Sequence, residues 1–237
     1  MARFSRLDTV LITLRTGLIP VVPTADAATT IGIVDALADG GVRVVELTNR
    51  GDGAVEVFAA VEAHCRDRRP DVIVGIGSVF DAGTASQYLN LGASFVVSPF
   101  LVDDVAVTCN RRMTAYMPGA ATPGEVMRAE VLGTEIVKVF PARTLGPSFV
   151  ADVLAPCPWS RLMPTGGIAP TREAVTPWLE AGAACLGLGS QLVPSADVAA
   201  SRWEDLSARA RGAIELIEQC RPPSTEAWAR DGVERHP

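Results

Sequence analysis

The sequence predicts an α/β fold, a (β/α)8 TIM barrel with an extra N-terminal helix. Short apolar segments alternate with amphipathic segments from end to end, and turn or cap signals mark each change. Four expected helices also end in glycine just before the next expected strand, at Gly40, Gly92, Gly133 and Gly182. Glycine at such a position turns the chain into the following strand. Eight units of roughly 20 to 30 residues fit a barrel better than an open sheet.

The elements follow one another in a regular order. A first helix is expected at 7–14, where we expect it to cap the amino end of the barrel. Strands are expected at 18–22, 42–48, 72–78, 95–99, 114–118, 136–140, 161–165 and 185–190. Helices are expected between them at 27–38, 54–68, 82–91, 105–112, 123–132, 148–154 and 172–181, and a long final helix at 197–220. A Rossmann-like sheet is the alternative, but no G-x-G-x-x-G follows an early strand.

Composition limits the domain organisation and the partners. No Pro/Gly-rich linker divides the 237 residues, so we expect one barrel domain over 1–220 and a polar tail over 221–237. The net charge of −6 comes from mixed acidic and basic residues, which argues against nucleic-acid and membrane partners. Five cysteines without C-x-x-C spacing indicate reduced thiols in a cytoplasmic protein. The first apolar run is broken by Arg15 and predicts a helix rather than a signal peptide.

The two histidines restrict the chemistry. His64 lies in an expected helix and His236 in the tail, and neither has a second histidine near it in sequence. This argues against a Ser-His-Asp triad and against a multi-histidine metal site. We therefore expect any catalysis to use lysine, glutamate, arginine and hydroxyl groups.

Lys138 is the candidate nucleophile. It interrupts the apolar, β-branched segment 135–141, which is typical of a strand buried on both faces. Burial disfavours the charged ammonium and favours the free amine, which attacks carbonyls. The alternative is a lysine at a strand end whose stem lies along apolar surface and whose amine stays in water. This segment alone leaves both interpretations open.

Other polar groups follow at the carboxyl ends of the expected strands, where barrels carry their functional residues. Glu46 follows Val42 and Val44 at period two, so it is expected inside the barrel with a raised pKa that suits proton transfer. Its alternative role is a structural ion pair with Arg50 or Lys138. Arg50 is either a clamp for a substrate carboxylate or a residue of the solvated rim. The glycine turns at 166–167 and 189–190 suit phosphate, although tight turns also require glycine.

Several motifs in fixed order then identify a family resemblance. They are Gly40-Gly41-Val42 with Glu46-Leu47-Thr48, Gly75-Ile76-Gly77-Ser78-Val79, Val97-Ser98-Pro99, Met117-Pro118-Gly119 with Thr122, Val137-Lys138-Val139-Phe140-Pro141, Pro164-Thr165-Gly166-Gly167-Ile168 and Gly187-Leu188-Gly189-Ser190. From about 19 to 194 the sequence resembles the 2-keto-3-deoxy-6-phosphogluconate / 4-hydroxy-2-oxoglutarate aldolase family. These are trimeric (β/α)8 class I aldolases that use a lysine Schiff base and need no metal.

The resemblance implies a role for each matching residue. Lys138 becomes the Schiff-base lysine and Glu46 the general acid and base. Arg50 and Thr165 bind the pyruvoyl carboxylate region, and the phosphate end consists of Gly166, Gly167, Gly189 and Ser190. The remaining substrate-binding residues are Ser78, Pro99 and Phe140. The resemblance further implies a small keto-acid substrate, no cofactor and a homotrimer.

Four positions depart from the common family pattern. Ser78 replaces a frequent threonine, Pro23 removes a cation after the first strand, Asn49 replaces an apolar residue, and Phe100 replaces smaller or polar ones. The expected reaction remains the cleavage of a 2-keto-4-hydroxy acid to pyruvate and an aldehyde, with the distal half of the substrate left open. The alternatives are a phosphate-binding barrel isomerase and a non-catalytic barrel that binds a keto acid or a sugar phosphate.

Overall fold

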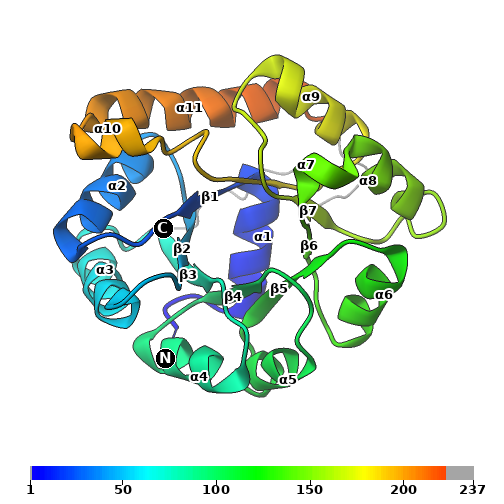
Figure 1. The fold of residues 1–237 in the computed structure, drawn as a ribbon, viewed down its shortest axis with the longest axis horizontal. Helices are drawn as coiled ribbons and strands as arrows, with labels where there is room; N and C mark the ends of the chain where they lie inside the picture. The colour runs from blue at the N-terminus through cyan, green and yellow to red at the C-terminus, as the bar shows by residue number, and fades with distance from the viewer. Residues whose placement is uncertain (1, 223–237) are drawn as a thin grey trace, which may run out of the picture.

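Eight parallel strands form a barrel inside a ring of helices in the computed structural model, which describes residues 2–222 (Figure 1). The strands are β1 Leu18–Val22, β2 Val44–Thr48, β3 Ile73–Gly77, β4 Phe95–Ser98, β5 Ala115–Ala120, β6 Val137–Val139, β7 Leu162–Pro164 and β8 Leu186–Leu188. Each strand pairs with its neighbour in sequence, and β1 also pairs with β8. A bridge between Thr165 and Gly187 joins the ends of β7 and β8. The predicted (β/α)8 barrel is confirmed.

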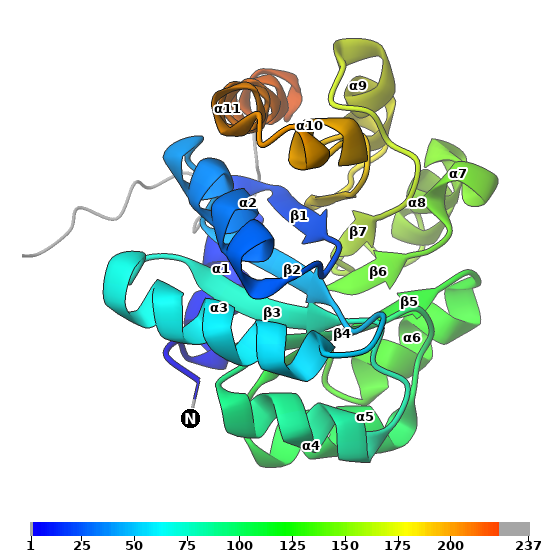
Figure 2. The same ribbon diagram turned by 60° about the vertical axis from the view of Figure 1, so that its left-hand side comes forward.

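The helices alternate with the strands and cover the outside of the barrel (Figures 1 and 2). They are α1 Arg6–Thr16, α2 Ala27–Asp39, α3 Ala54–Arg68, α4 Ala82–Leu91, α5 Asp103–Arg111, α6 Pro123–Val131, α7 Ala142–Leu145, α8 Pro147–Leu154, α9 Arg172–Glu180, α10 Ser195–Ala199 and α11 Trp203–Cys220. Side-chain caps define several starts, as at Thr122, whose capping box with Glu125 begins α6. Gly92, at φ 107°, ends α4 in the left-handed conformation.

Two helical segments differ from the expected elements. The final helix expected at 197–220 is two helices, because Ser201 adopts a φ of 51° between α10 and α11. Asp197 stabilises this break by pairing with Arg202 at 2.6 Å and with Arg209 at 2.7 Å. The short helix α7 was not expected, and Gly146, at φ 75°, separates it from α8.

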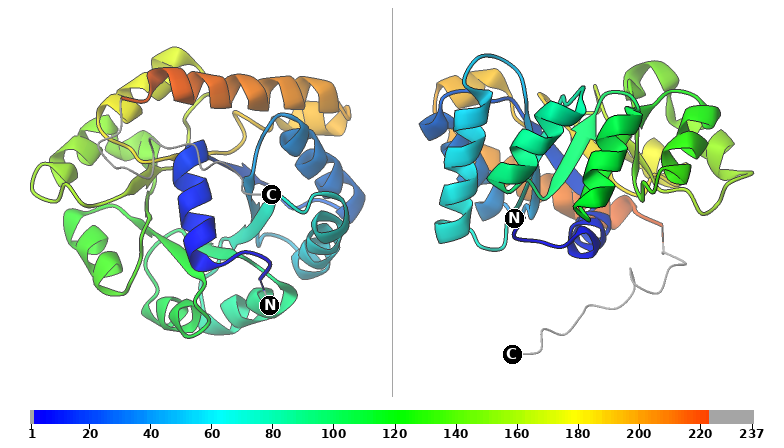
Figure 3. Two further views of the ribbon diagram at one scale, coloured as in Figure 1. Left: turned by 180° about the vertical axis from the view of Figure 1, so that it is seen from behind. Right: turned by 90° about the horizontal axis from the view of Figure 1, so that it is seen from below.

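The apolar core has two layers, one on each side of the strands. The outer layer lies between the strands and the surrounding helices. The inner layer fills the barrel with residues such as Ile19, Ile73 and Phe95, and Val10 and Leu14 of α1 belong to it. Figure 3 shows α1 lying across one end of the barrel. As expected, the first helix caps the amino end of the barrel, so the carboxyl end is left for the functional groups.

Two ion pairs fasten the N-terminal segment to this end. Arg6 binds Glu135 at 2.6 Å, and Arg3 binds the buried carboxylate of Glu62 at 2.8 Å. None of the helices in 2–222 is both long and apolar enough to cross a membrane. The single-domain boundary remains a prediction, and the predicted tail lies outside the described residues from position 223 onward.

Candidate active site

Glycines make room for polar side chains in the carboxyl half of the barrel. The Glu46 carboxyl carbon lies only 2.6 Å from the position that a β-carbon on Gly77 would take. The Thr165 methyl group lies 2.9 Å from the corresponding position on Gly187. Any larger residue at either glycine would meet these side chains. The apolar layer around Ile73 and Phe95 therefore gives way to a layer that holds Glu46 and Thr165.

Lys138 and Glu46 meet inside this layer from opposite sides of the barrel. Their Nζ and Oε1 atoms are 4.0 Å apart, and the two residues are only 6% and 1% exposed. The Lys138 amine also lies 5.1 Å from the centroid of the Phe140 ring, within range of a cation–π contact. The interpretation of Lys138 as a strand-end lysine with its amine in water is therefore wrong. The ion-pair alternative for Glu46 is compatible with this geometry.

The environment of Glu46 favours a carboxyl group that exchanges protons. Burial raises the pKa of Glu46, and the positive charges of Lys138 and Arg50 oppose that rise. The Oε2 atom has no hydrogen-bond partner among the described residues. Thr48, two residues further along the same strand face, also buries a hydroxyl that has no partner among residues 2–222. This face of β2 thus presents a carboxyl oxygen and a hydroxyl without hydrogen-bond partners among residues 2–222. Thr48 was not among the residues predicted for the site.

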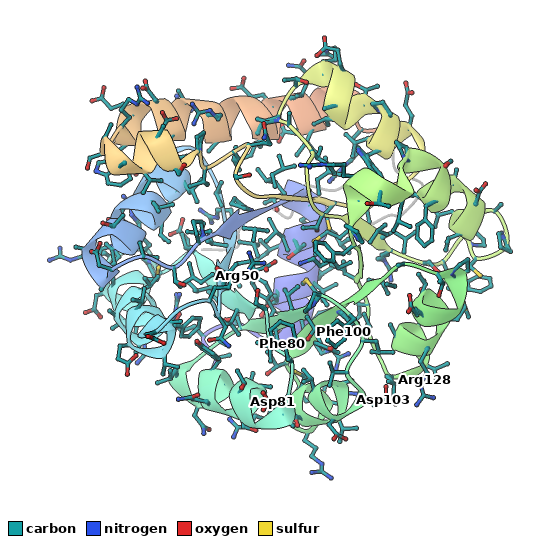
Figure 4. The ribbon with its side chains drawn as sticks, in the orientation of Figure 1. Arg50, Phe80, Asp81, Phe100, Asp103 and Arg128 are labelled. Atoms are coloured by element: carbon teal, nitrogen blue, oxygen red, sulfur yellow. The ribbon has the colours of Figure 1, made fainter. Side chains whose placement is uncertain are left out.

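Arg50 and Ser78 join the ends of β2 and β3. The Arg50 Nε donates a hydrogen bond of 3.0 Å to the Ser78 hydroxyl. Ser78 is buried, and its φ of 61° places it in the left-handed conformation directly after β3. Arg50 is exposed and lies inside the ring of helices in Figure 4. The structure thus brings together two predicted substrate-binding residues, one cation and one hydroxyl, at the carboxyl end of the barrel.

Two departures from the family pattern occupy defined places. The Asn49 side chain accepts a hydrogen bond of 2.7 Å from the Tyr88 hydroxyl, so it is a structural polar contact with α4. Phe100 is 53% exposed and its ring centroid lies 5.8 Å from that of Phe80 (Figure 4). The carbonyl of Pro99 lies against Gly119, which pairs with Lys138 between β5 and β6. Pro99 therefore contacts the strand next to the candidate nucleophile.

The turns after β7 and β8 are neighbours because Thr165 pairs with Gly187. Thr165 is buried, and its hydroxyl donates to the Met163 carbonyl at 3.3 Å. Gly166 and Gly167 have φ values of 107° and 80°, and Gly166 lies against the Phe140 ring. In the second turn Gly189 accepts hydrogen bonds from Leu192 and Val193, and Ser190 is exposed. The four residues predicted for the phosphate end thus lie on two adjacent turns.

Arg143, which no sequence motif singled out, lies on α7 beside the first of these turns. Its Nη2 atom is 2.8 Å and its Cζ atom 3.0 Å from the β-carbon position of Gly167. The only signal for it in the sequence is an arginine five residues after Lys138.

Among residues 2–222, no three His, Cys, Asp or Glu side chains come together in a way that could hold a metal ion. The candidate site consequently consists of an amine, a carboxyl group, hydroxyls, arginines and glycine turns.

Comparisons with known proteins point to one family. The model of the KDPG and KHG aldolase family matches residues 10–208. A 2-dehydro-3-deoxy-phosphogluconate aldolase of Treponema pallidum is 33% identical, over 86% of this chain and 94% of that protein. The KHG/KDPG aldolase of Escherichia coli K12 is 31% identical, over 83% and 90%. A crystal structure of the 2-keto-3-deoxy-6-phosphogluconate aldolase of Zymomonas mobilis with 3-phosphoglycerate is 28% identical, with a TM-score of 0.76 and coverage of 92% and 100%.

Proposed function

The chain belongs to the KDPG and KHG aldolase family, and on that premise we propose that it cleaves a 2-keto-4-hydroxy acid to pyruvate and an aldehyde. The substrate is 2-keto-3-deoxy-6-phosphogluconate or 4-hydroxy-2-oxoglutarate, as the names of the relatives suggest. One observation carries the proposal for the site. The buried Lys138 amine lies 4.0 Å from the buried Glu46 carboxyl, which places a nucleophile beside a proton carrier.

The reaction begins with attack of the neutral Lys138 amine on the C2 carbonyl of the substrate. Glu46 transfers protons while the carbinolamine forms and loses water to give an iminium ion. Glu46 then accepts the C4 hydroxyl proton as the C3–C4 bond breaks, and the iminium takes up the electron pair as an enamine. The aldehyde leaves, the enamine is protonated at C3, and water releases pyruvate and the free lysine. The raised pKa of Glu46 suits a group that must both accept and return protons.

The remaining residues bind the two ends of the substrate. Arg50, held by Ser78, and Thr165 bind the carboxylate beside C2, where a guanidinium can make paired hydrogen bonds. Phe140 and Pro99 lie next to Lys138 and limit the space around the reacting carbons. Backbone amides of Gly166, Gly167 and Gly189 and the Ser190 hydroxyl receive the phosphate of a phosphorylated substrate.

The alternatives raised from the sequence are not favoured. An isomerase needs acid and base groups without a covalent amine, and a binding protein has no use for a buried lysine amine beside a buried carboxyl group. The matched relatives are named as aldolases.

We also propose that the protein is a cytoplasmic homotrimer. Its five cysteines are free thiols, which agrees with a reducing compartment. The trimer rests on the family resemblance. Light scattering during size-exclusion chromatography would test it, and a particle of three 24.9 kDa chains is expected. A monomeric or dimeric mass would contradict this part of the proposal.

Turnover tests the function directly. Wild-type protein should release pyruvate from either keto acid in an assay coupled to lactate dehydrogenase, and EDTA should not change the rate. Lys138→Met should lose this activity while Arg128→Gln, which changes an exposed arginine on α6, should keep it. Full activity of Lys138→Met would refute the Schiff-base mechanism.

A further inference from the structure

We propose that Arg143 determines the specificity of this enzyme for a phosphate at the distal end of the substrate. The inference rests on the proposed aldolase function and adds a residue to it. The Arg143 guanidinium binds the phosphate together with the backbone amides of the turn after β7. The enzyme is then selective for a phosphorylated 2-keto-4-hydroxy acid over its unphosphorylated counterpart.

The backbone holds Arg143 at the right place. Helix α7 begins directly after the strand of Lys138, and its first residues are fastened to the β7 turn. The Ala142 amide donates to the Thr165 carbonyl at 3.0 Å, and the Arg143 amide donates to the Gly166 carbonyl at 3.2 Å. These bonds link the strand of the nucleophile to the glycine turn and fix the start of the Arg143 side chain between them.

The side chain then extends over the turn. The guanidinium lies on the face of Gly167 where a larger residue would place its β-carbon. Gly167 has a φ of 80° and Gly166 a φ of 107°, so this turn favours glycine at both positions. Amides in turns of this kind form concave sites for anions. The guanidinium and the turn therefore provide N–H donors on the same part of the barrel end.

The charge of Arg143 is available to a ligand. No acidic side chain within residues 2–222 pairs with it, whereas the exposed Arg128 on α6 is paired with Asp103 (Figure 4). An arginine guanidinium carries a positive charge and only hydrogen-bond donors. A neutral hydroxyl accepts few of these donors and gains nothing from the charge, whereas a phosphate pairs with the charge and accepts two or more of the N–H groups.

The length of the substrate indicates which anion reaches Arg143. In 4-hydroxy-2-oxoglutarate the distal carboxylate is attached to C4, beside the bond that breaks. In 2-keto-3-deoxy-6-phosphogluconate the phosphate follows two further carbons. With C2 bound to the buried Lys138, the phosphate extends farther from the nucleophile than the carboxylate does, toward the exposed Gly167 turn and the Arg143 side chain above it.

Three substrates and three variants test the inference. The substrates are 2-keto-3-deoxy-6-phosphogluconate, 2-keto-3-deoxygluconate and 4-hydroxy-2-oxoglutarate. For Arg143→Gln, kcat/KM should fall roughly 10- to 100-fold on the phosphorylated substrate, mainly through KM, and stay within about 2-fold on the other two. Arg143→Lys should recover part of the loss. Arg128→Gln, the matched control for removal of an exposed arginine, should behave as wild type on all three.

Inorganic phosphate supplies a readout that does not depend on turnover. Phosphate should raise the melting temperature of wild type and of Arg128→Gln, and raise that of Arg143→Gln much less. An unchanged kcat/KM of Arg143→Gln on the phosphorylated substrate, or an equal loss on all three substrates, would overturn the inference. If wild type cleaves none of the three, the proposed function fails by itself, and equal phosphate stabilisation of wild type and Arg143→Gln would then separately overturn the role of Arg143.

Discussion

Replacing Gly77 by alanine tests whether the position of Glu46 controls the chemistry. A β-carbon on Gly77 would lie 2.6 Å from the Glu46 carboxyl carbon, whereas ordinary contact begins at 3.4 Å. The carboxyl carbon must therefore retreat by at least about 0.8 Å, the difference between these two distances, and the Glu46 Oε1 atom, which lies closer still to the β-carbon position, must move farther. A misplacement of about 1 Å can lower a rate by roughly 100-fold. We expect Gly77→Ala to lower kcat by roughly that factor and to cost about 1–3 kcal/mol of stability through overpacking.

The assay is steady-state pyruvate release, with circular dichroism and thermal melting to show that the variant is folded. Gly212→Ala is the matched control, because this glycine of α11 has no atoms outside the local backbone of its own helix within 4 Å of its β-carbon position. That control should keep its activity and gain up to about 1 kcal/mol in stability from helix propensity. A folded Gly77→Ala protein with wild-type kcat would refute the reasoning that the glycine keeps Glu46 in place.

Three further predictions concern charge and burial. Because burial raises the pKa of Glu46 above its ordinary 4.5, the stability contributed by its protonated form is present at low pH and lost as pH rises through the raised pKa. Glu46→Gln should therefore gain stability relative to wild type as pH rises from about 4 to about 8 in urea titrations. Arg3→Met leaves the buried Glu62 with Arg66, at 3.7 Å, as its only ion-pair partner among the described residues, and should cost about 3 kcal/mol. Arg43→Met breaks an exposed pair with Asp71 and should cost less than about 1 kcal/mol. Burial raises the pKa of three thiols to about 12, so native protein should resist iodoacetamide at Cys65, Cys109 and Cys185 and react at Cys157 and Cys220.

A specific outcome would contradict each of these predictions. A stability difference between Glu46→Gln and wild type that does not change with pH would mean that Glu46 titrates as an ordinary glutamate. Equal losses in Arg3→Met and Arg43→Met would show that burial of Glu62 carries no special cost. Rapid modification of Cys185 in the native state would contradict its burial inside the barrel.

Most of the fold follows from local patterns in the sequence. Alternating apolar and amphipathic segments located all eight strands, and glycines located the ends of four helices. The errors occur where tertiary contacts determine the ends of an element. The strand expected from residue 42 begins at Val44, because the Val42 amide is used by the Leu37 carbonyl at the end of α2. The break at Ser201 depends on the ion pairs of Asp197, which are not apparent from the periodicity of the segment.

The sequence predicted the site residues whose place depends on their position in a strand. It did not predict the contacts that side chains make across the barrel. Period two placed Glu46 inside, and the strand pattern placed Lys138 in the same barrel, so their proximity could be expected. The bond between Arg50 and Ser78, the contact of Glu46 with Gly77 and the position of Arg143 over Gly167 depend on three-dimensional packing. A glycine in a strand and an arginine shortly after a strand have many ordinary uses, so neither was distinctive in the sequence.

Covalent trapping tests the central claim most directly. Borohydride added with pyruvate should reduce a Schiff base and leave a stable adduct, located by mass spectrometry on the peptide that contains Lys138. Lys138→Met should give no adduct under the same conditions, and Arg128→Gln should give the wild-type amount. An unmodified Lys138, or an adduct of equal yield in Lys138→Met, would contradict the role of the buried lysine as nucleophile.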